Sequence, residues 1–403
     1  MIKNITNVKG FKCWGSHSGV KSMRRDLAMI FSEVPANAAA VFTQNKVVAE
    51  PIKISREHVK DGQLQAIVIN AGNANACTGE QGRQGAQAMV DTASESLGID
   101  PSMILIASTG IIGEPFPTQL VVDGIIDIVP KLSSDSRAGS FAANAILTTD
   151  TFAKEGFIEF DLDDSHIHMA GIAKGSGMIH PNMATMLAFI VTDAYIDSTL
   201  LQESVKKAAD RSFNMITVDG DTSTNDMVAV LANGLAGNAF IDSEQHANYP
   251  VFYQKLEEMM IHLAKLIVAD GEGASKFIEY KVTGTATEAD ARALVRQISG
   301  SSLVKTAMYG RDPNWGRIVC AAGNAGVPFE YEKADLYLGD SKQMIQVLEA
   351  GKPTEFDRVG MKRILRDSHL HVHLEVHQGD AQSIGWGSDL TTDYVMFNSV
   401  YTT

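Results

Sequence analysis

The sequence predicts an α/β protein whose strands and helices pack in layers around a mixed or antiparallel sheet, rather than a Rossmann fold. Three observations predict this class. Short apolar runs alternate with glycine-rich turns, strands and helices follow one another without a regular βαβ rhythm, and from about Phe277 the pattern becomes α+β. The 34 glycines outnumber the 11 prolines, so we expect many turns to use positive φ.

The chain has 403 residues, of which 45% are hydrophobic and 20% are charged. This balance is typical of globular proteins and unlike that of disordered chains. A chain of this length usually folds as two or three domains with a large buried core. We expect a catalytic domain, 1–280, and a smaller C-terminal α+β lobe, 281–403.

The strands are predicted from short apolar or alternating segments: 27–31 and 38–43, closed by Pro35 and Asn45, then 65–70, 103–107, 157–162, 166–172, 186–191 and a strand that starts at Phe277. The helices are predicted from apolar residues at helical spacing: 80–97, 120–129, 138–147, 200–213, 250–268 and 287–298. Ser198 or Thr199 is the expected N-cap of the helix over 200–213. Pro250 is favourable at the start of its helix.

Composition excludes several classes of protein. The formal net charge is −14 and no basic block is present, so we expect no nucleic-acid partner. No apolar run is long enough to span a bilayer, and the first residues lack the apolar region of a secretory signal. Cys13, Cys77 and Cys320 are odd in number and far apart, which fits a reducing cytoplasm and argues against a zinc site.

The most informative segment is 174–187, KGSGMIHPNMATML, in which a Gly/Ser turn and a proline-containing loop lead into a buried strand. A threonine at the start of a strand is common and carries no signal by itself. Here small Ala184 leaves the preceding peptide bond open to attack by the Thr185 hydroxyl. Cleavage between Ala184 and Thr185 would give Thr185 a free α-amine, the general base for its own hydroxyl.

At this point the sequence resembles the ornithine acetyltransferase family, the glutamate N-acetyltransferases of arginine biosynthesis. The resemblance covers almost the whole chain and rests on seven ordered motifs: NAGNANACTG (70–79), STGIIGEPFP (108–117), KGSGMIHPNMATMLAFIVTDA (174–194), DGDTSTND (219–226), ADGEGASKF (269–277), GRDPNWGRI (310–318) and WGSDLTTDYVMFNSVYTT (386–403). It implies an αββα sandwich, self-cleavage between Ala184 and Thr185 into α and β chains, and an α2β2 heterotetramer of the processed chains.

The resemblance also assigns site residues. Thr109 and Gly110 end a predicted strand, and the resemblance makes them the oxyanion donors rather than a plain turn. It makes Lys174 and Glu272 substrate-binding, although an isolated Lys is usually a solvated surface group and an acid after a helix is usually exposed. It adds Thr149, with its neighbours as alternatives, and Asn398 and Thr403 from a terminal segment that would otherwise be expected to fray.

Two other patterns suggest metal sites, and we favour a different interpretation of both. Asp219, Asp221 and Asp226 lack the spacing of a calcium loop and more plausibly hold loop backbone through Asx turns. His369, His371, His373 and His377 alternate along one face of a strand, opposite an apolar face, and read as its solvated side. They could still bind adventitious nickel or zinc. Arg311 and Arg317, beside Trp315, suggest an anion cradle, but we assign them to architecture.

The expected function is a ping-pong acyl transfer from N2-acetyl-L-ornithine to L-glutamate through an acyl-Thr185 intermediate. Lys174 and Glu272 would hold the charges common to the two amino acids. No cofactor is expected; some family members also accept acetyl-CoA, and the residues do not decide whether this chain does. The first alternative is an amidohydrolase or aminopeptidase on the same fold. The second is a non-catalytic protein that binds a small anion, which predicts an uncleaved chain.

Overall fold

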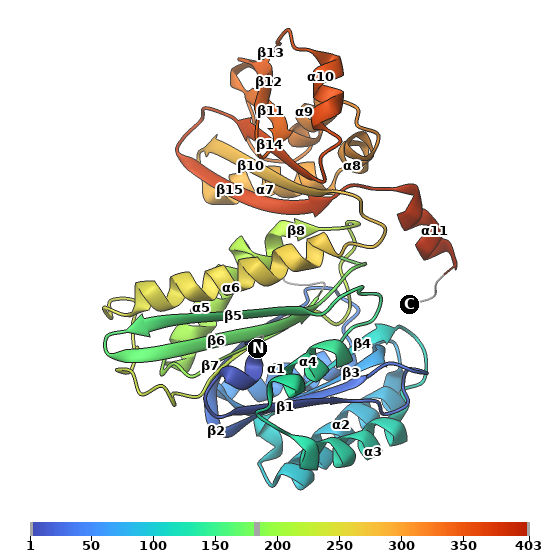
Figure 1. The fold of residues 1–403 in the computed structure, drawn as a ribbon, viewed down its shortest axis with the longest axis vertical. Coiled ribbons are helices and arrows are strands. Elements are labelled where there is room, and N and C mark those ends of the chain that lie inside the picture. Colours follow the sequence, from blue (N-terminus) through green and yellow to red (C-terminus); the bar gives the residue numbers. More distant parts are fainter. Residues whose placement is uncertain (1–2, 181–185, 401–403) are drawn as a thin grey trace.

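The computed structural model describes residues 3–180 and 186–400, and its strands form two sheets (Figure 1). The first sheet has the order β4-β3-β2-β9-β7-β6-β5, with β1 paired to β2. Its strands are β1 (Phe11–Ser16), β2 (Leu27–Phe42), β3 (Gln63–Asn73), β4 (Ile104–Ile111), β5 (Lys154–Leu162), β6 (Ser165–Lys174), β7 (Leu187–Thr192) and β9 (Met227–Ala232). The β3–β4 and β7–β9 pairs are parallel and the others antiparallel, so the predicted mixed sheet is confirmed.

Strand β2 corrects the prediction of two strands separated at Pro35. It is continuous, but its pairing with β3 shifts register between Phe31 and Ala36. Pro35 lies in this irregular stretch, where the missing N–H of proline costs no ladder hydrogen bond. Before the shift β2 lies between β1 and β3, and after it β2 pairs with β9. One strand therefore joins the two halves of the sheet.

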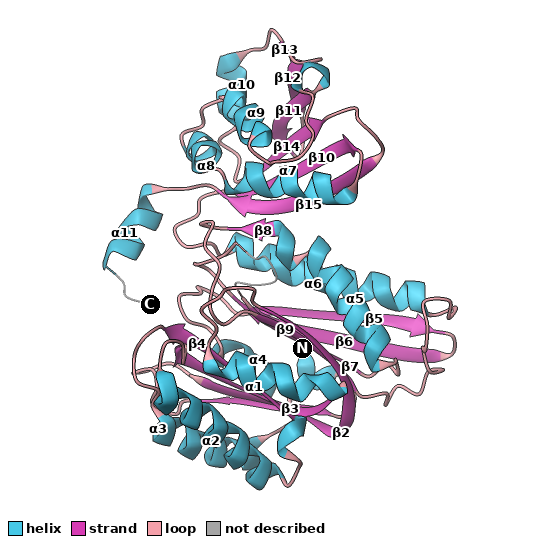
Figure 2. Cartoon of the chain, turned by 180° about the vertical axis from the view of Figure 1, so that it is seen from behind, coloured by secondary structure: helices cyan, strands magenta, loops and turns pink. Residues whose placement is uncertain are grey.

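Three layers of buried side chains separate four layers of secondary structure. Helices α2 (Gly79–Leu97) and α3 (Thr118–Ile128) pack on the outer face of β2–β4, and α5 (Ser198–Arg211) and α6 (Tyr249–Ala269) on the outer face of β5–β7. The core between the two halves includes α1 (Glu50–His58) and α4 (Ser136–Ala145). Both views show this order of layers (Figures 1 and 2), which confirms the predicted αββα sandwich.

The second sheet has the order β13-β12-β11-β14-β10-β15-β8. Its strands are β8 (Ile216–Thr217), β10 (Phe277–Thr285), β11 (Asp335–Asp340), β12 (Met344–Glu349), β13 (Lys352–Pro353), β14 (His369–Glu375) and β15 (Ala381–Ser388). Helices α7 (Glu288–Gly300), α8 (Ser302–Tyr309), α9 (Trp315–Gly323) and α10 (Arg358–Ile364) belong to this part of the chain. Its core is continuous with that under α5 and α6. The boundary at 280/281 stays a prediction; it falls within β10.

The six predicted helices are present with small shifts at their ends, but the N-cap of α5 was wrong. Asp197 caps it, because its carboxylate accepts from the backbone N–H groups of Thr199 and Leu200. Pro250 lies in the first turn of α6, as predicted. Short 3-10 helices complete the secondary structure: η1 (Ile5–Asn7), η2 (Val59–Asp61), η3 (Pro101–Met103), η4 (Val129–Lys131), η5 (Phe213–Met215) and η6 (Tyr331–Lys333). Within 3–180 and 186–400, no helix has the length and apolar character needed to cross a bilayer.

The last helix, α11 (Thr392–Val400), leaves the second sheet and extends back toward the first (Figure 1). Its outer positions, including Val395 and Met396, are exposed. Tyr394, Phe397 and Asn398 have the i, i+3, i+4 spacing of one helix face, and all three line a cavity between the sheets. The C-terminal segment thus reaches the site described next.

Candidate active site

A cavity of about 820 Å³ brings together residues from segments far apart in the sequence. Six of the predicted site residues line it: Thr109, Gly110, Thr149, Lys174, Glu272 and Asn398. Ala184, Thr185 and Thr403 lie outside the described residues. Met186 and Leu187 also line the cavity, so the described chain resumes in the cavity wall directly after Thr185.

The Thr109–Gly110 wall is built by close contact between β3 and β4. Gly110 has φ +131°, and a Cβ there would lie 2.3 Å from the carbonyl carbon of Gly72. Only glycine fits such an approach. The Asn225 amide fixes the neighbouring backbone by donating to the carbonyls of Ala74, at 2.6 Å, and Ser108, at 2.8 Å. The cavity wall at Gly110 is therefore rigid backbone.

The Thr109 hydroxyl accepts a hydrogen bond from Lys174 Nζ at 3.3 Å. A hydroxyl that accepts through its oxygen keeps its own hydrogen free to donate. Thr109 is buried, and Lys174, the last residue of strand β6, is buried beside it. The pair can thus direct one hydroxyl hydrogen into the cavity, backed by a positive charge.

Lys174 belongs to a buried network of alternating charges. The Asp150 carboxylate lies 4.0 Å from Lys174 Nζ, and its Oδ1 accepts from the Gly175 N–H at 2.7 Å. Lys154 Nζ, fully buried, donates to Asp150 Oδ1 at 2.7 Å and to Asp270 Oδ2 at 2.6 Å. Each charge has an opposite partner, as burial in a protein requires. The network joins β5, β6 and the end of α6 at the floor of the cavity.

Burial and neighbouring charges act in opposite directions on this network. Burial lowers the pKa of Lys174, although Asp150 opposes that change. Burial alone would raise the pKa of Asp150, but Lys174 and Lys154 more than offset it and hold it at about 2. Asp150 is therefore ionised at neutral pH and anchors the two lysines.

Glu272 lies on the cavity wall, just after the end of α6. Its backbone N–H donates to the Ser176 carbonyl at 3.0 Å, and its Oε2 accepts from the Asn398 amide at 3.0 Å. A Cβ at Gly177 would lie 2.3 Å from the Glu272 carboxyl, so glycine at 177 makes room for it. Two predicted residues 126 positions apart, Glu272 and Asn398, are thus in direct contact.

Asp219 holds the segment that leads to the predicted cleavage site. Its carboxylate accepts from the backbone N–H groups of Met178, at 2.6 Å, and Ile179, at 2.8 Å, and from the Tyr394 hydroxyl at 3.2 Å. Burial raises the pKa of Asp219, against these hydrogen bonds. It also accepts from the N–H of Asp221, the predicted Asx contact, at 3.3 Å. The shorter hydrogen bonds of Asp219, however, are to Met178 and Ile179, outside the 219–226 loop.

The sequence did not single out Asp150, Lys154 or Lys21. Lys21 lines the cavity and donates to the Leu147 carbonyl at 2.8 Å, and burial lowers its pKa to about 8. No local pattern marks these residues, because each is recognisable only by its burial beside distant charges. Thr148 and Thr151 line the cavity with Thr149, so the alternatives to Thr149 stay open.

His369, His371 and His373 lie on the more exposed face of β14, while Leu370, Val372 and Leu374 are buried, as predicted. The prediction was wrong for His377, which lies beyond the end of β14 with φ +52° and so does not share that face. His371 Nδ1 lies 3.5 Å from Glu279, the His373 ring bonds the Thr283 hydroxyl, and His377 pairs with Asp335. Arg317 donates to the Leu303 carbonyl within the second part of the chain, which fits an architectural role. Neither group lines the cavity.

Comparison with known proteins places the chain in a family. The ArgJ family model matches residues 12–403. The arginine biosynthesis bifunctional protein ArgJ of Symbiobacterium thermophilum is 47% identical over 402 residues, 99% of this chain and 98% of the relative. That of Staphylococcus epidermidis is 45% identical over 401 residues, 99% and 98% of the two chains. A crystal structure of the Bacillus halodurans protein of the same name is 43% identical, with a TM-score of 0.51, and covers 54% of this chain and 100% of its own. The chain belongs to the ArgJ family.

Proposed function

We propose that this protein transfers the acetyl group of N2-acetyl-L-ornithine to L-glutamate, giving ornithine and N-acetylglutamate in arginine biosynthesis. Membership of the ArgJ family supports the pathway. The observation that carries the chemistry is the shared cavity: Thr109, Gly110, Thr149, Lys174, Glu272 and Asn398 line it together with Met186, the residue after Thr185.

In the first half-reaction, the Thr185 hydroxyl oxygen attacks the acetyl carbonyl carbon while the freed Thr185 amine accepts the hydroxyl proton. The Thr109 hydroxyl and the Gly110 N–H stabilise the oxyanion of the tetrahedral intermediate, and one such donor is typically worth about 3 kcal/mol of barrier. Lys174 Nζ donates a hydrogen bond to the Thr109 hydroxyl oxygen at 3.3 Å, which leaves the Thr109 hydrogen free for the oxyanion. The C–N bond then breaks, and the leaving ornithine amine takes the proton from the Thr185 ammonium.

In the second half-reaction, the α-amine of glutamate attacks the acyl ester and the Thr185 amine removes its proton. The proton returns to the Thr185 oxygen as N-acetylglutamate leaves. Donor and acceptor share an α-carboxylate but differ in side-chain charge, so the cavity must accept either sign. It offers Lys21 and Lys174 as well as Glu272, which supports one site for both substrates. No cofactor takes part in either step.

We propose that the chain cleaves itself between Ala184 and Thr185. In support, the Asp219 carboxylate holds the backbone of Met178 and Ile179, which precede that bond in the sequence. The Bacillus halodurans chain adds support, because it is matched over its whole length by 54% of this chain. Residues 185–403 are 219 of 403 residues, the same share.

Further properties follow from the family resemblance and are proposals. The processed α and β chains assemble as an α2β2 heterotetramer in the cytoplasm. Acetyl-CoA serves as a second acetyl donor to glutamate, and the word bifunctional in the relatives' names supports a second activity.

An assay with acetyl-labelled N2-acetylornithine, with and without glutamate, tests the reaction. We expect labelled N-acetylglutamate in amounts equal to the ornithine released. Free acetate as the only labelled product, whether or not glutamate is present, would instead identify an amidohydrolase. Thr185→Ala is the control and should give neither product and a single 403-residue chain.

The open choice among the threonines is tested by a matched pair, Thr148→Ala and Thr149→Ala, because both side chains are half-buried in the cavity wall. We expect the KM for glutamate or acetylornithine to rise more for Thr149→Ala. A larger rise for Thr148→Ala would move the contact to that residue.

A further inference from the structure

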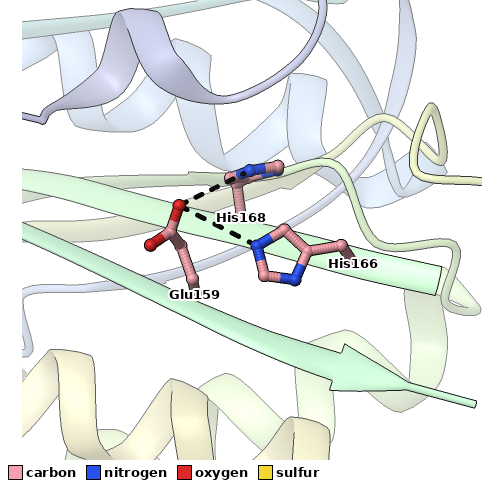
Figure 3. A group of neighbouring side chains, drawn as sticks. All are labelled: Glu159, His166 and His168. Carbon is pink, nitrogen blue, oxygen red and sulfur yellow. Dashed lines mark ion pairs between the residues drawn. The ribbon is translucent and has the colours of Figure 1, made fainter.

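The β5–β6 hairpin carries a group of metal-ligating side chains outside the cavity. Glu159 and His168 are directly opposite across the two strands, as are Asp161 and His166. Because side chains alternate along a strand, all four lie on one face, while Phe160 and Ile167 are buried on the other. Figure 3 shows Glu159, His166 and His168 converging on one point. In the sequence, the group is marked only by the two alternating histidines of His166-Ile167-His168.

The three ligand atoms are close to the spacing of a metal site. Glu159 Oε1 lies 3.8 Å from His166 Nε2 and 3.9 Å from His168 Nε2, and the three ligand atoms all lie within 4.8 Å of one another. With metal–ligand distances of about 2.0–2.2 Å, tetrahedral Zn²⁺ holds its ligand atoms roughly 3.3 Å apart. The Glu159 and His166 side chains are substantially exposed, so side-chain rotation can close the difference.

Second partners fix both rings in the orientation that a metal needs. His166 Nδ1 lies 2.7 Å from Asp161 Oδ1, and His168 Nδ1 lies 2.8 Å from Asp193 Oδ2. Ionised carboxylates only accept hydrogen bonds, so each Nδ1 donates its hydrogen to the carboxylate, which leaves Nε2 as the ring atom that faces the shared point. Asp193 is buried and also accepts from the His168 backbone N–H at 2.8 Å. A carboxylate behind each histidine is the usual arrangement around zinc.

We propose that Glu159, His166 and His168 form a Zn²⁺ site with water in the fourth position. The ordinary alternative is a set of exposed ion pairs around Glu159, which also pairs with Lys3. Lys3 competes with the metal for the same carboxylate oxygen, and it lies over the Phe157 ring at 5.3 Å. Binding of Zn²⁺ therefore requires Lys3 to leave Glu159.

The site is structural rather than catalytic. His168 lies six residues before Lys174 on β6, which at about 3.3 Å per residue puts it roughly 20 Å from that end of the strand. We therefore expect Zn²⁺ to raise the melting temperature of the folded protein by binding linkage, without changing acetyl transfer.

Zinc binding by the untagged protein, measured by equilibrium dialysis with metal analysis, tests the site. Cys77 and Cys320 are exposed thiols, so the measurements use a Cys77→Ser, Cys320→Ser background. We expect one Zn²⁺ per chain, and a loss of affinity of at least about 100-fold in the variant with His166→Gln and His168→Gln. The matched control carries His371→Gln and His373→Gln on β14 and should bind as the background does.

Two single variants make the test independent of that double substitution. Asp161→Asn, at an exposed position, should weaken binding about 10-fold through the His166 ring. Lys3→Met should tighten it by removing the competitor. Equal zinc affinity after His166→Gln and His168→Gln, loss only in the β14 control, or no binding below millimolar zinc would each overturn the proposal.

Discussion

The two ends of the β5–β6 hairpin hold charged groups in opposite surroundings. At the cavity end, Lys154 and Lys174 are buried and alternate with Asp150 and Asp270. At the far end, the side chains of Glu159, Lys3, His166 and His168 are partly exposed to solvent. Ion pairs of similar length therefore contribute differently to stability, because water screens the exposed pairs and does not screen the buried ones. The buried set therefore contributes more to stability, pair for pair, than the exposed set.

The largest effect is expected from Lys154→Met at the buried end. The substitution keeps most of the volume but leaves Asp150 and Asp270 without their shared cation. Breaking a buried pair in this way costs about 3–5 kcal/mol of stability. Urea unfolding at fixed protein concentration measures it, and a loss below about 1 kcal/mol would show that the buried network behaves like a surface pair.

The second-largest effect is expected on catalysis, from a substitution at the cavity end of the hairpin. Lys174→Ala removes the ammonium that donates a hydrogen bond to Thr109 and that we propose binds the substrate carboxylate. We expect kcat/KM for glutamate to fall about 100-fold, comparable with the loss of one oxyanion donor, while self-cleavage is largely kept. Steady-state kinetics over a range of glutamate concentrations measures this. An unchanged dependence on glutamate would remove Lys174 from the substrate site.

Acid should weaken the buried end selectively. The pKa of Asp150 is about 2 in the folded chain, against 3.8 ordinarily, so its ionised form is preferred on folding. Ionised Asp150 therefore contributes about 2 kcal/mol to the free energy of unfolding. This contribution is complete above about pH 4 and is lost as the pH falls toward 2. We therefore expect the stability difference between wild type and Asp150→Asn to shrink over that window. A difference independent of pH would contradict the assigned pKa.

The smallest effect is the matched substitution at the far end, Lys3→Met. It breaks the exposed pair with Glu159, and such pairs contribute about 0–1 kcal/mol. The same urea measurement as for Lys154→Met applies. A cost similar to that of the buried lysine would remove the distinction between the two ends.

Periodicity predicts many of the strands and helices because it reports which side chains are buried, whereas the αββα order of layers was implied by the family resemblance. It fails at Pro35, where local chemistry suggests a break but the register shift lets β2 continue. It also did not predict α8–α10, because the last helix expected from the sequence was that over 287–298. Helices α8 and α9 pack against α7 and against each other, and α10 packs against β11; no local pattern reports these contacts.

For the site, motifs identified six of the residues that line the cavity, but not Lys21 and Asp150, which also line it, or Lys154 beside Asp150. Asp150 and Lys154 carry no motif signal, since their importance comes from contact with Lys174 and Asp270 across the fold. His166 and His168 did carry a signal, alternation on a strand, but it becomes informative only when Glu159 is seen opposite them.

The proposed mechanism depends on one chemical event, the release of an α-amine at Thr185. Amino-terminal sequencing and intact mass of the purified active enzyme measure it directly. We predict two polypeptides, residues 1–184 and 185–403, with threonine as the first residue of the second. A fully active enzyme that consists only of the uncut 403-residue chain would contradict the account.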